Sequence, residues 1–389
     1  MFPKLSQYYK YAVVGLFVYM PFHIFFSQWL STFTGYLDVW KIGKDVFAWA
    51  ILIFGSALVI YAKKTNRLFW ILWGLLLAYT AIHGILFITT DQPIRTGVLA
   101  MIYNTRLMWF VLIGYNLSLL VKDKAKLAKQ FTKYLLVVST IVCVVALLQW
   151  ILPKDIMTHF GYSIERGVKP AFFIDDKTDL PRVMSTVRDP NSLGAFLILP
   201  ILLLFNLVIN NWKTNKKTLL GGVMLLHILI LFLTFSRGAW LGTILAGGLY
   251  LVLTYKKQII KYALAYKYII IILVLIFGLF TYAMRDQYIV QNVLLHSDEN
   301  TKLEDSNSLH ASLIKKGVDG IADQPEGHGP GTAGLVSVHS PSGSFITENY
   351  YVQIAYEVGI FGLMIFLSWL GYLLWVLRKN MIIISALAG

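Results

Sequence analysis

The chain has 389 residues, of which 57% are hydrophobic and only 14% are charged, and its mean hydropathy is +0.65. Soluble domains carry about 25% charged residues, so this composition excludes a soluble enzyme and a soluble binding module. The net charge of +14 would suit a nucleic-acid partner, but we expect none, because the cations are distributed between apolar segments in a pattern typical of membrane topology.

Ten stretches are long and apolar enough to cross a bilayer, which takes about 20 residues. In chain order they are residues 11–30, 46–62, 68–89, 97–121, 134–152, 192–212, 219–235, 239–255, 262–284 and 347–377. The nine residues MIIISALAG at the end are too few to cross, so we expect an eleventh span that is cut short. We predict an all-α polytopic integral membrane protein with about ten or eleven transmembrane helices and two long extracytoplasmic loops.

The loop cations predict the orientation. If the N-terminus is cytoplasmic, the inner loops hold most lysines, namely Lys4, Lys10, Lys63, Lys64, Lys122, Lys124, Lys126, Lys129, Lys133, Lys213, Lys216, Lys217, Lys256, Lys257, Lys261, Lys267 and Lys379. The short outer loops hold only Lys41, Lys44, Arg95 and Arg237. This asymmetry follows the positive-inside rule. The chain begins without a small-residue cleavage site, which indicates a retained first span rather than a removed signal peptide.

We divide the chain at its two long loops. The predicted parts are an N-terminal five-span bundle (1–152), an outer loop (153–188), a four-span core (189–284) with Arg182 and Arg237 at its outer face, a large outer loop (285–346) and the C-terminal span or spans (347–389). The large loop is rich in Gly, Ser, Asp and His, so it is either functional or disordered.

Arginine departs from the lysine pattern. Of nine arginines, six fall in outer segments, namely Arg95, Arg166, Arg182, Arg188, Arg237 and Arg285. A guanidinium presents a planar fork that matches phosphate oxygens, so these positions are candidates for binding a phosphate or pyrophosphate. The alternative is that they bind lipid headgroups or pair with loop carboxylates. Cys143 is the only cysteine, which excludes a disulfide within the chain and a thiolate metal site.

The segment PRVMSTVRDPNSLG, residues 181–194, leads into a predicted helix. Asp189 suits the N-cap, and Pro190 suits the first helical position because it lacks an N–H that would be unpaired there. Such a start presents free N–H groups and a partial positive charge, which bind phosphate. Together with Arg182, Arg188 and Asn191 it forms a candidate anion site, although a simple helix cap explains Asp189 and Pro190 equally well.

Ser236-Arg237-Gly238 joins two short spans. A charge at mid-membrane costs about 2.5–3.5 kcal/mol, so Arg237 is expected at the bilayer surface or in a cavity, with a partner. Gly238 allows the turn to tighten and a ligand to approach. The alternative is an arginine that only reaches toward the headgroups.

Arg106 lies inside the fourth predicted span, beside Asn104 and Thr105. An ionisable residue at this depth is either part of a functional site or one half of a structural pair. Glu357 is the structural partner that we consider.

The second outer loop closes with EGHGPGTAG, residues 326–334, whose glycines can present backbone N–H groups. A helix follows in which Asn349, Gln353 and Glu357 recur every four residues and form a polar stripe on one face. We expect this stripe to line a cavity or to pack between helices, and we expect Gly359 and Gly362 to permit close helix contact.

In their order and spacing these segments resemble the O-antigen ligase and polymerase superfamily of bacterial envelope glycosyltransferases. The similar parts are PRVMSTVRDPN, SRGAW, the pattern from Pro325 to Gly331, and Asn349 through Glu357 with Gly359 and Gly362. The resemblance covers about residues 180–365. It implies a GT-C-like, metal-independent and cofactor-free transfer of a glycan from a polyprenyl-diphosphate carrier to a glycan, lipid or protein acceptor, at the outer face of the bacterial plasma membrane.

The resemblance also implies residue roles. Arg182 and Arg237 take the positions that hold the pyrophosphate in the family. The further substrate-binding candidates are Arg188, Asn191, Ser236, Gly329, Gly331, Asn349, Gln353 and Arg106. Membrane lipids are expected partners, and a chain-length regulator or a flippase is a further candidate.

The chain departs from the family at one point. Ligases usually carry His-Asn where this chain has Glu348-Asn349, and that histidine is tied to acceptor activation. Glu348 is therefore a candidate base, and His310, His328 and His339 are alternatives. His310 sits where relatives often have a basic residue, so Glu348 and His310 join Arg182 and Arg237 as catalytic candidates.

The missing histidine favours a polymerase over a ligase that acts on lipid A core, a wall polymer or a protein. A transporter for the lipid-linked glycan ranks lower, because its polar residues should lie at mid-membrane in broken helices of related halves. A structural membrane anchor needs neither Arg237 nor the polar stripe.

Overall fold

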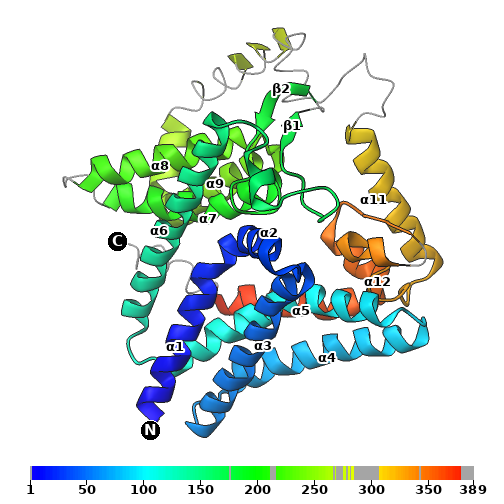
Figure 1. Cartoon of the computed structure of the whole chain (residues 1–389). Helices are drawn as coiled ribbons and strands as arrows, with labels where there is room; N and C mark the ends of the chain where they lie inside the picture. The colour runs from blue at the N-terminus through cyan, green and yellow to red at the C-terminus, as the bar shows by residue number, and fades with distance from the viewer. Residues whose placement is uncertain are drawn as a thin grey trace. The chain divides into compact units, whose positions relative to one another are not determined.

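The computed structural model describes residues 2–174, 177–210, 216–265, 306–340 and 343–377, with a few isolated positions between 268 and 283. Its α-helices are α1 (Phe2–Tyr19), α2 (His23–Thr34), α3 (Leu37–Tyr61), α4 (Arg67–Thr89), α5 (Ile94–Leu120), α6 (Lys124–Ile151), α7 (Pro190–Asn210), α8 (Lys216–Leu233), α9 (Arg237–Ala265), α11 (Ser306–Asp323) and α12 (Tyr350–Leu377) (Figure 1). Short 3-10 helices are η1 (Met20–Phe22), η2 (Ile156–Phe160) and η4 (Gly334–His339).

Eight segments of the described chain are long and apolar enough to cross a membrane. They are Phe2–Thr34, Leu37–Tyr61, Arg67–Thr89, Ile94–Leu120, Lys124–Ile151, Pro190–Asn210, Lys216–Leu233 and Tyr350–Val376. The predicted all-α polytopic membrane fold is confirmed. The predicted span 239–255 lies within α9, whereas most of 262–284, Arg285 and the last nine residues fall outside the described residues.

Local sequence signals explain several helix ends. Asn66 and Asp123 precede α4 and α6, and their side chains accept hydrogen bonds from Phe69 N–H and Lys126 N–H. Gly35 ends α2 with a φ of 76°, a conformation that glycine adopts without the strain of a side chain. Pro21 falls in the 3-10 turn between α1 and α2, because a proline has no N–H with which to continue the α-helical pattern.

One short antiparallel hairpin interrupts the helices. Strand β1 (Phe172–Ile174) pairs with β2 (Lys177–Arg182), and Phe172 lies opposite Arg182. Both strands lie in the segment that the sequence predicts to be an outer loop (153–188). Strand β2 ends on Arg182, so the hairpin positions one of the two arginines that the resemblance assigns to the pyrophosphate.

The chain forms two compact units, and each is described by itself. The first comprises Met1–Val13, Asp45–Lys122 and Glu299–Arg378; the second comprises Val14–Lys44, Asp123–Asp298 and Lys379–Gly389. In the first unit α4 packs against both α5 and α12, and α11 packs against α12. In the second unit α7 packs against α8 and α9, and α6 packs against α7 and α8.

Each unit has its own apolar core. In the second unit the core includes Val142 of α6, Leu193 and Leu197 of α7, and Ile230 of α8. In the first unit Trp109 of α5 and Trp369 of α12 are buried almost completely. Large apolar side chains on the helix faces, such as Leu77 and Ile244, are exposed, as expected of surfaces that contact lipid.

Candidate functional site

Arg182 is held in place by two other segments of the second unit. Its Nε donates to the carbonyl oxygen of Thr234 at 2.9 Å, and its Nη2 donates to Oδ1 of Asn191 at 2.8 Å. The neighbouring Val183 N–H donates to Leu233 O at 3.1 Å. The guanidinium therefore lies between the turn that joins α8 to α9 and the first turn of α7.

The segment between Arg182 and α7 is fixed by buried polar contacts. Oε1 of Gln149 accepts from Met184 N–H at 3.0 Å and from Ser185 N–H at 2.9 Å. Ser185 has a φ of 55°, and its hydroxyl donates to Val142 O at 2.7 Å. These contacts hold a strained turn rigid, so the positions of Arg182 and Arg188 on either side of it are set by α6.

The start of α7 confirms the expected helix cap. Oδ1 of Asp189 accepts from Ser192 N–H at 2.8 Å, and Oδ2 accepts from the Ser192 hydroxyl at 2.9 Å. Pro190 is the first residue of the helix. Asn191 follows it and is exposed, with its side-chain oxygen turned to Arg182.

Two helices begin close together here. Helix α9 starts at Arg237, after a turn in which Phe235 has a φ of 48° and Ser236 N–H donates to Thr234 Oγ1 at 3.2 Å. A Cβ at Gly194 of α7 would lie 2.6 Å from the Cβ of Ala239 of α9, so the two helix starts approach as closely as a glycine allows. The partial positive ends of two helices thus lie at one end of the unit, beside Arg182 and Arg237.

Arg166 has a different role from the one that the arginine pattern indicated. Its Nε donates to Gln28 Oε1 at 3.1 Å, and its Nη2 donates to Gln28 O at 2.9 Å and to the Ser31 hydroxyl. It therefore closes the C-terminal end of α2. Its backbone oxygen accepts from Lys41 Nζ at 2.9 Å.

In the first unit, the structure brings together the two remaining catalytic candidates. Nδ1 of His310, in the first turns of α11, lies 3.4 Å from Oε2 of Glu348, just before α12. Their side chains are 49% and 36% exposed, so a substrate can reach both. Glu348 has a φ of 54°, an unusual value for a residue with a side chain and one that recurs at functional sites.

The glycine-rich loop packs against a break in α12. The helix departs from helical geometry at Val358 and at Gly359, which has a φ of 71° and a ψ of 177°. His328 N–H donates to Tyr356 O at 2.8 Å, and Gly329 N–H donates to Glu357 O at 3.0 Å. The expected role of Gly359 in helix contact is wrong: this glycine forms the break, because a Cβ there would collide with the backbone of Glu326.

The contacts of Gly329 and Gly331 are those of packing. A Cβ at Gly329 would meet Thr90 Oγ1, and a Cβ at Gly331 would lie 2.5 Å from Thr96 Cγ2. Both glycines have positive φ values, of 100° and 86°. The loop therefore fits against the turn between α4 and α5 only because these residues lack side chains.

The polar stripe of α12 packs between segments of the first unit. Glu357 is buried; its Oε2 accepts from Asn104 Nδ2 at 2.6 Å, and its Oε1 accepts from Ala333 N–H at 3.2 Å. Asn349 precedes α12, and its Oδ1 accepts from the N–H groups of Tyr351 and Val352 at 2.9 and 3.1 Å. Gln353 lies against Gly334 of the loop.

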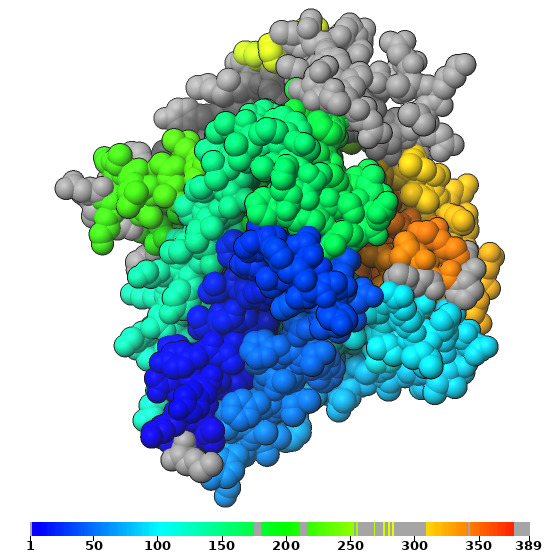
Figure 2. Space-filling model, in the orientation of Figure 1, coloured from blue at the N-terminus to red at the C-terminus, as the bar shows by residue number. Residues whose placement is uncertain are grey.

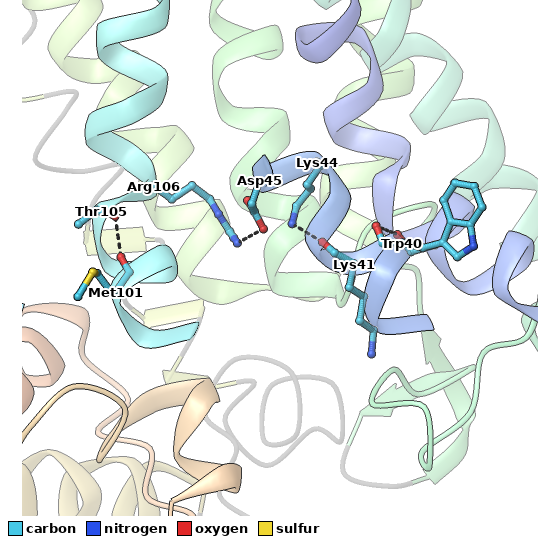
Figure 3. A network of polar contacts seen from close by, with 8 residues as sticks. Trp40, Lys41, Lys44, Asp45, Met101, Thr105 and Arg106 are labelled. Atoms are coloured by element: carbon cyan, nitrogen blue, oxygen red, sulfur yellow. Dashed lines mark hydrogen bonds and ion pairs between the residues drawn. The ribbon is translucent and has the colours of Figure 1, made fainter. Parts of the chain in front are cut away.

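Arg106 pairs with Asp45 of α3 rather than with Glu357. Its Nη2 lies 3.0 Å from Asp45 Oδ2 (Figure 3). Its guanidinium lies 4.3 Å from the centre of the Tyr103 ring. The structural pair that we considered with Glu357 is wrong, because Asn104 takes that position. The nearby Thr105 hydroxyl donates to Met101 O within its own helix.

Sequence reasoning missed Gln149 and Asn104 as supports of these sites. The available signal was an amide within an apolar span: Gln149 is the only amide in 134–152, and Asn104 shares 97–121 with Asn116. His328 stacks on Tyr356 with 3.9 Å between ring centres, and the side chain of His339 lies outside the described residues.

Residues 222–367 match a family model described as O-antigen ligase. The resemblance to the O-antigen ligase and polymerase superfamily is confirmed. The matched region contains Arg237, His310, Glu348 and the glycine-rich loop, whereas Arg182 and the start of α7 precede it. No curated protein and no solved structure matches the chain.

This match to the O-antigen ligase family supports a glycan ligase or polymerase role for this integral membrane protein. It also implies a lipid-linked glycan donor, a glycan acceptor and contact with membrane lipids.

Proposed function

We propose that this protein is a polysaccharide polymerase of the outer face of the plasma membrane, which takes its glycan from a polyprenyl diphosphate without a metal ion. The observation that carries the proposal is the position of Arg182, held by Thr234 O and Asn191 between the starts of α7 and α9. Arg237 begins α9 and Arg188 precedes α7, so both add positive charge near Arg182. Ser236, just before α9, adds a hydroxyl group.

This arrangement suits a diphosphate leaving group. Negative charge grows on the diphosphate as the bond between the anomeric carbon and its oxygen breaks. Because Arg182 is fixed by two hydrogen bonds before the substrate arrives, its charge needs no rearrangement to stabilise that oxygen. The two helix starts add donor N–H groups and partial positive charge in the same direction.

His310 and Glu348 are the groups that we assign to the acceptor. Nδ1 of His310 lies 3.4 Å from a Glu348 carboxylate oxygen. The tautomer that carries its proton on Nδ1 has a lone pair on Nε2, which can take the acceptor hydroxyl proton. The hydroxyl oxygen then forms a bond to the anomeric carbon, and the diphosphate leaves with the electron pair of the broken bond. The exposure of both side chains permits a large acceptor to reach them.

A polymerase is preferred to a ligase because Glu348-Asn349 replaces the His-Asn pair that is usual in ligases. A ligase acting on lipid A core, a wall polymer or a protein is the second candidate. The test incubates purified full-length protein with a lipid-linked oligosaccharide. A ladder of products shows polymerisation, whereas a single transfer to an added acceptor shows ligation.

The arginine site is tested in the same assay. Arg182→Ala and Arg237→Ala are each expected to remove the visible ladder at normal protein levels, because a transfer rate about 10²–10³-fold lower leaves no detectable chain growth. Arg95→Ala serves as the matched control, because Arg95 is an exposed arginine at the start of α5 in the other unit. Unchanged product from either of the first two variants would refute the proposed diphosphate site.

A further inference from the structure

The first turns of α6 carry a separate basic surface. Lys126, Lys129 and Lys133 are spaced three and four residues apart, so they share one face of the helix. All three side chains are exposed, and the beginning of α6 lies at the surface of the molecule (Figure 2). With Asp123, Ala125 and Gln130 they line a surface cavity of about 440 Å³.

The charges around this cavity favour an anion. Oδ1 of Asp123 caps the helix by accepting from Lys126 N–H at 2.8 Å, and the first turn of α6 contains no acidic residue. The partial positive charge at a helix start repels nearby cations, so Lys126, in the first turn, raises the free energy of the helix start. Among the described residues, no carboxylate forms a salt bridge with any of the three.

From the sequence, we expect this surface to lie at the height of the lipid headgroups. The apolar part of α6 begins directly after Lys133, and Phe131 packs edge-on against Phe17 of α1 at 5.1 Å between ring centres. That contact fixes the rotation of α6 within the second unit, so the lysine face is presented outward. Lysine stems can extend along an apolar surface while their ammonium groups reach the headgroup region.

We propose that the face of Lys126, Lys129 and Lys133 binds the phosphate headgroup of an anionic membrane lipid, of the phosphatidylglycerol or cardiolipin class. Positive-inside lysines alone need only be present in the loop. Here they lie on one helix face around a surface cavity, so their ammonium groups can converge on one anionic headgroup. The inference does not depend on the proposed glycan transfer.

The test measures lipid binding by the full-length protein in detergent. Each variant is titrated with phosphatidylglycerol and with zwitterionic phosphatidylcholine, and retained lipid is counted by native mass spectrometry. Lysine near an anionic lipid surface strengthens binding roughly fivefold, so the triple variant Lys126→Gln, Lys129→Gln and Lys133→Gln should bind phosphatidylglycerol about 100-fold more weakly. Binding of phosphatidylcholine should not change.

Two controls make the outcome specific. A matched triple variant, Lys4→Gln, Lys63→Gln and Lys216→Gln, removes the same charge from other exposed positions that we expect on the same side. It should retain phosphatidylglycerol, as should a triple replacement of the three site lysines by arginine. An equal loss in both glutamine variants would refute the site. Displacement of the lipid by free inorganic phosphate at the lipid's own concentration would refute the lipid as its ligand.

Discussion

The two units place their buried and half-buried charges in different surroundings. In the second unit, Arg237 begins α9, and the side chain of Arg182 at the end of β2 reaches the starts of α7 and α9, where the helix dipoles favour an added anion. In the first unit, Glu357 and Arg106 lie within helices, and each is matched by a partner from the protein itself, Asn104 and Asp45. In this chain, the charged residues near helix ends are candidates for binding a ligand. Those inside helices make structural contacts with other side chains.

The glycines differ in the same way. Gly194 of the second unit is limited by the side chain of Ala239, whereas Gly359 of the first unit is limited by the backbone of Glu326 and by its positive φ. A side chain can be shortened by substitution, but a backbone cannot. The first unit is therefore the less tolerant of the two at its glycine contacts.

The largest effect is expected from the proposed base. His310→Ala should lower the rate of transfer by about 10²–10⁴-fold, the usual contribution of a general base, and leave donor binding intact. Single-turnover kinetics with lipid-linked oligosaccharide measures the rate, and His328→Ala is the control because that ring is stacked on Tyr356. If the two variants transfer at the same rate, His310 is not the base.

Arg182→Ala should lower the rate by about 10²–10³-fold, which corresponds to the loss of one fixed donor to a growing charge. Arg182→Lys should recover little of this, because one ammonium cannot bond Thr234 O and Asn191 in the geometry of a planar fork.

Arg106→Lys tests whether the arginine of the first unit is structural, in contrast to Arg182. That change should affect thermal stability more than transfer, and the reverse result would contradict the structural role of Arg106.

Alanine substitutions at Gly194 and Gly359 should differ in whether a second substitution can restore stability. Gly194→Ala should cost about 1–3 kcal/mol by overpacking, and the second change Ala239→Gly should restore most of it. Gly359→Ala should cost a similar amount or more, through strain at a φ of 71°, and no neighbouring side-chain change should restore it. Thermal unfolding in detergent measures both. Failure of the Ala239→Gly rescue would show that α7 and α9 are not in contact at this point.

The smallest effect is expected at the cap of α7. Asp189→Ala removes the acceptor for Ser192 N–H and should cost about 1 kcal/mol of stability. Asp189→Asn should cost much less, because an amide oxygen also caps a helix. If the two substitutions are equally harmful, the negative charge of Asp189 matters and the simple cap is not its whole role.

The apolar helices could be predicted from the sequence because hydropathy alone determines which segments can cross a bilayer. The cap at Asp189 and Pro190 was also predictable, since it depends on neighbouring residues only. The partner of Glu357 could not be predicted, because spacing along α12 gives the face on which a residue lies but not the helix that packs against that face. Likewise, no local signal places Arg182 on Thr234, since their contact depends on a short hairpin and a turn 52 residues away.

Two contacts of the segment before α7 join it to parts of the chain made earlier. Thr186 Oγ1 donates to Pro21 O at 2.9 Å, and Gln149 accepts from the two preceding N–H groups. Synthesis proceeds from the N-terminus, so both acceptors leave the ribosome before residues 184–186 do. The segment that carries Arg182 can therefore bind acceptors that are synthesised before it. A substitution of Gln149 should therefore reduce the amount of protein that reaches the membrane more than it reduces the catalytic rate of the protein that folds.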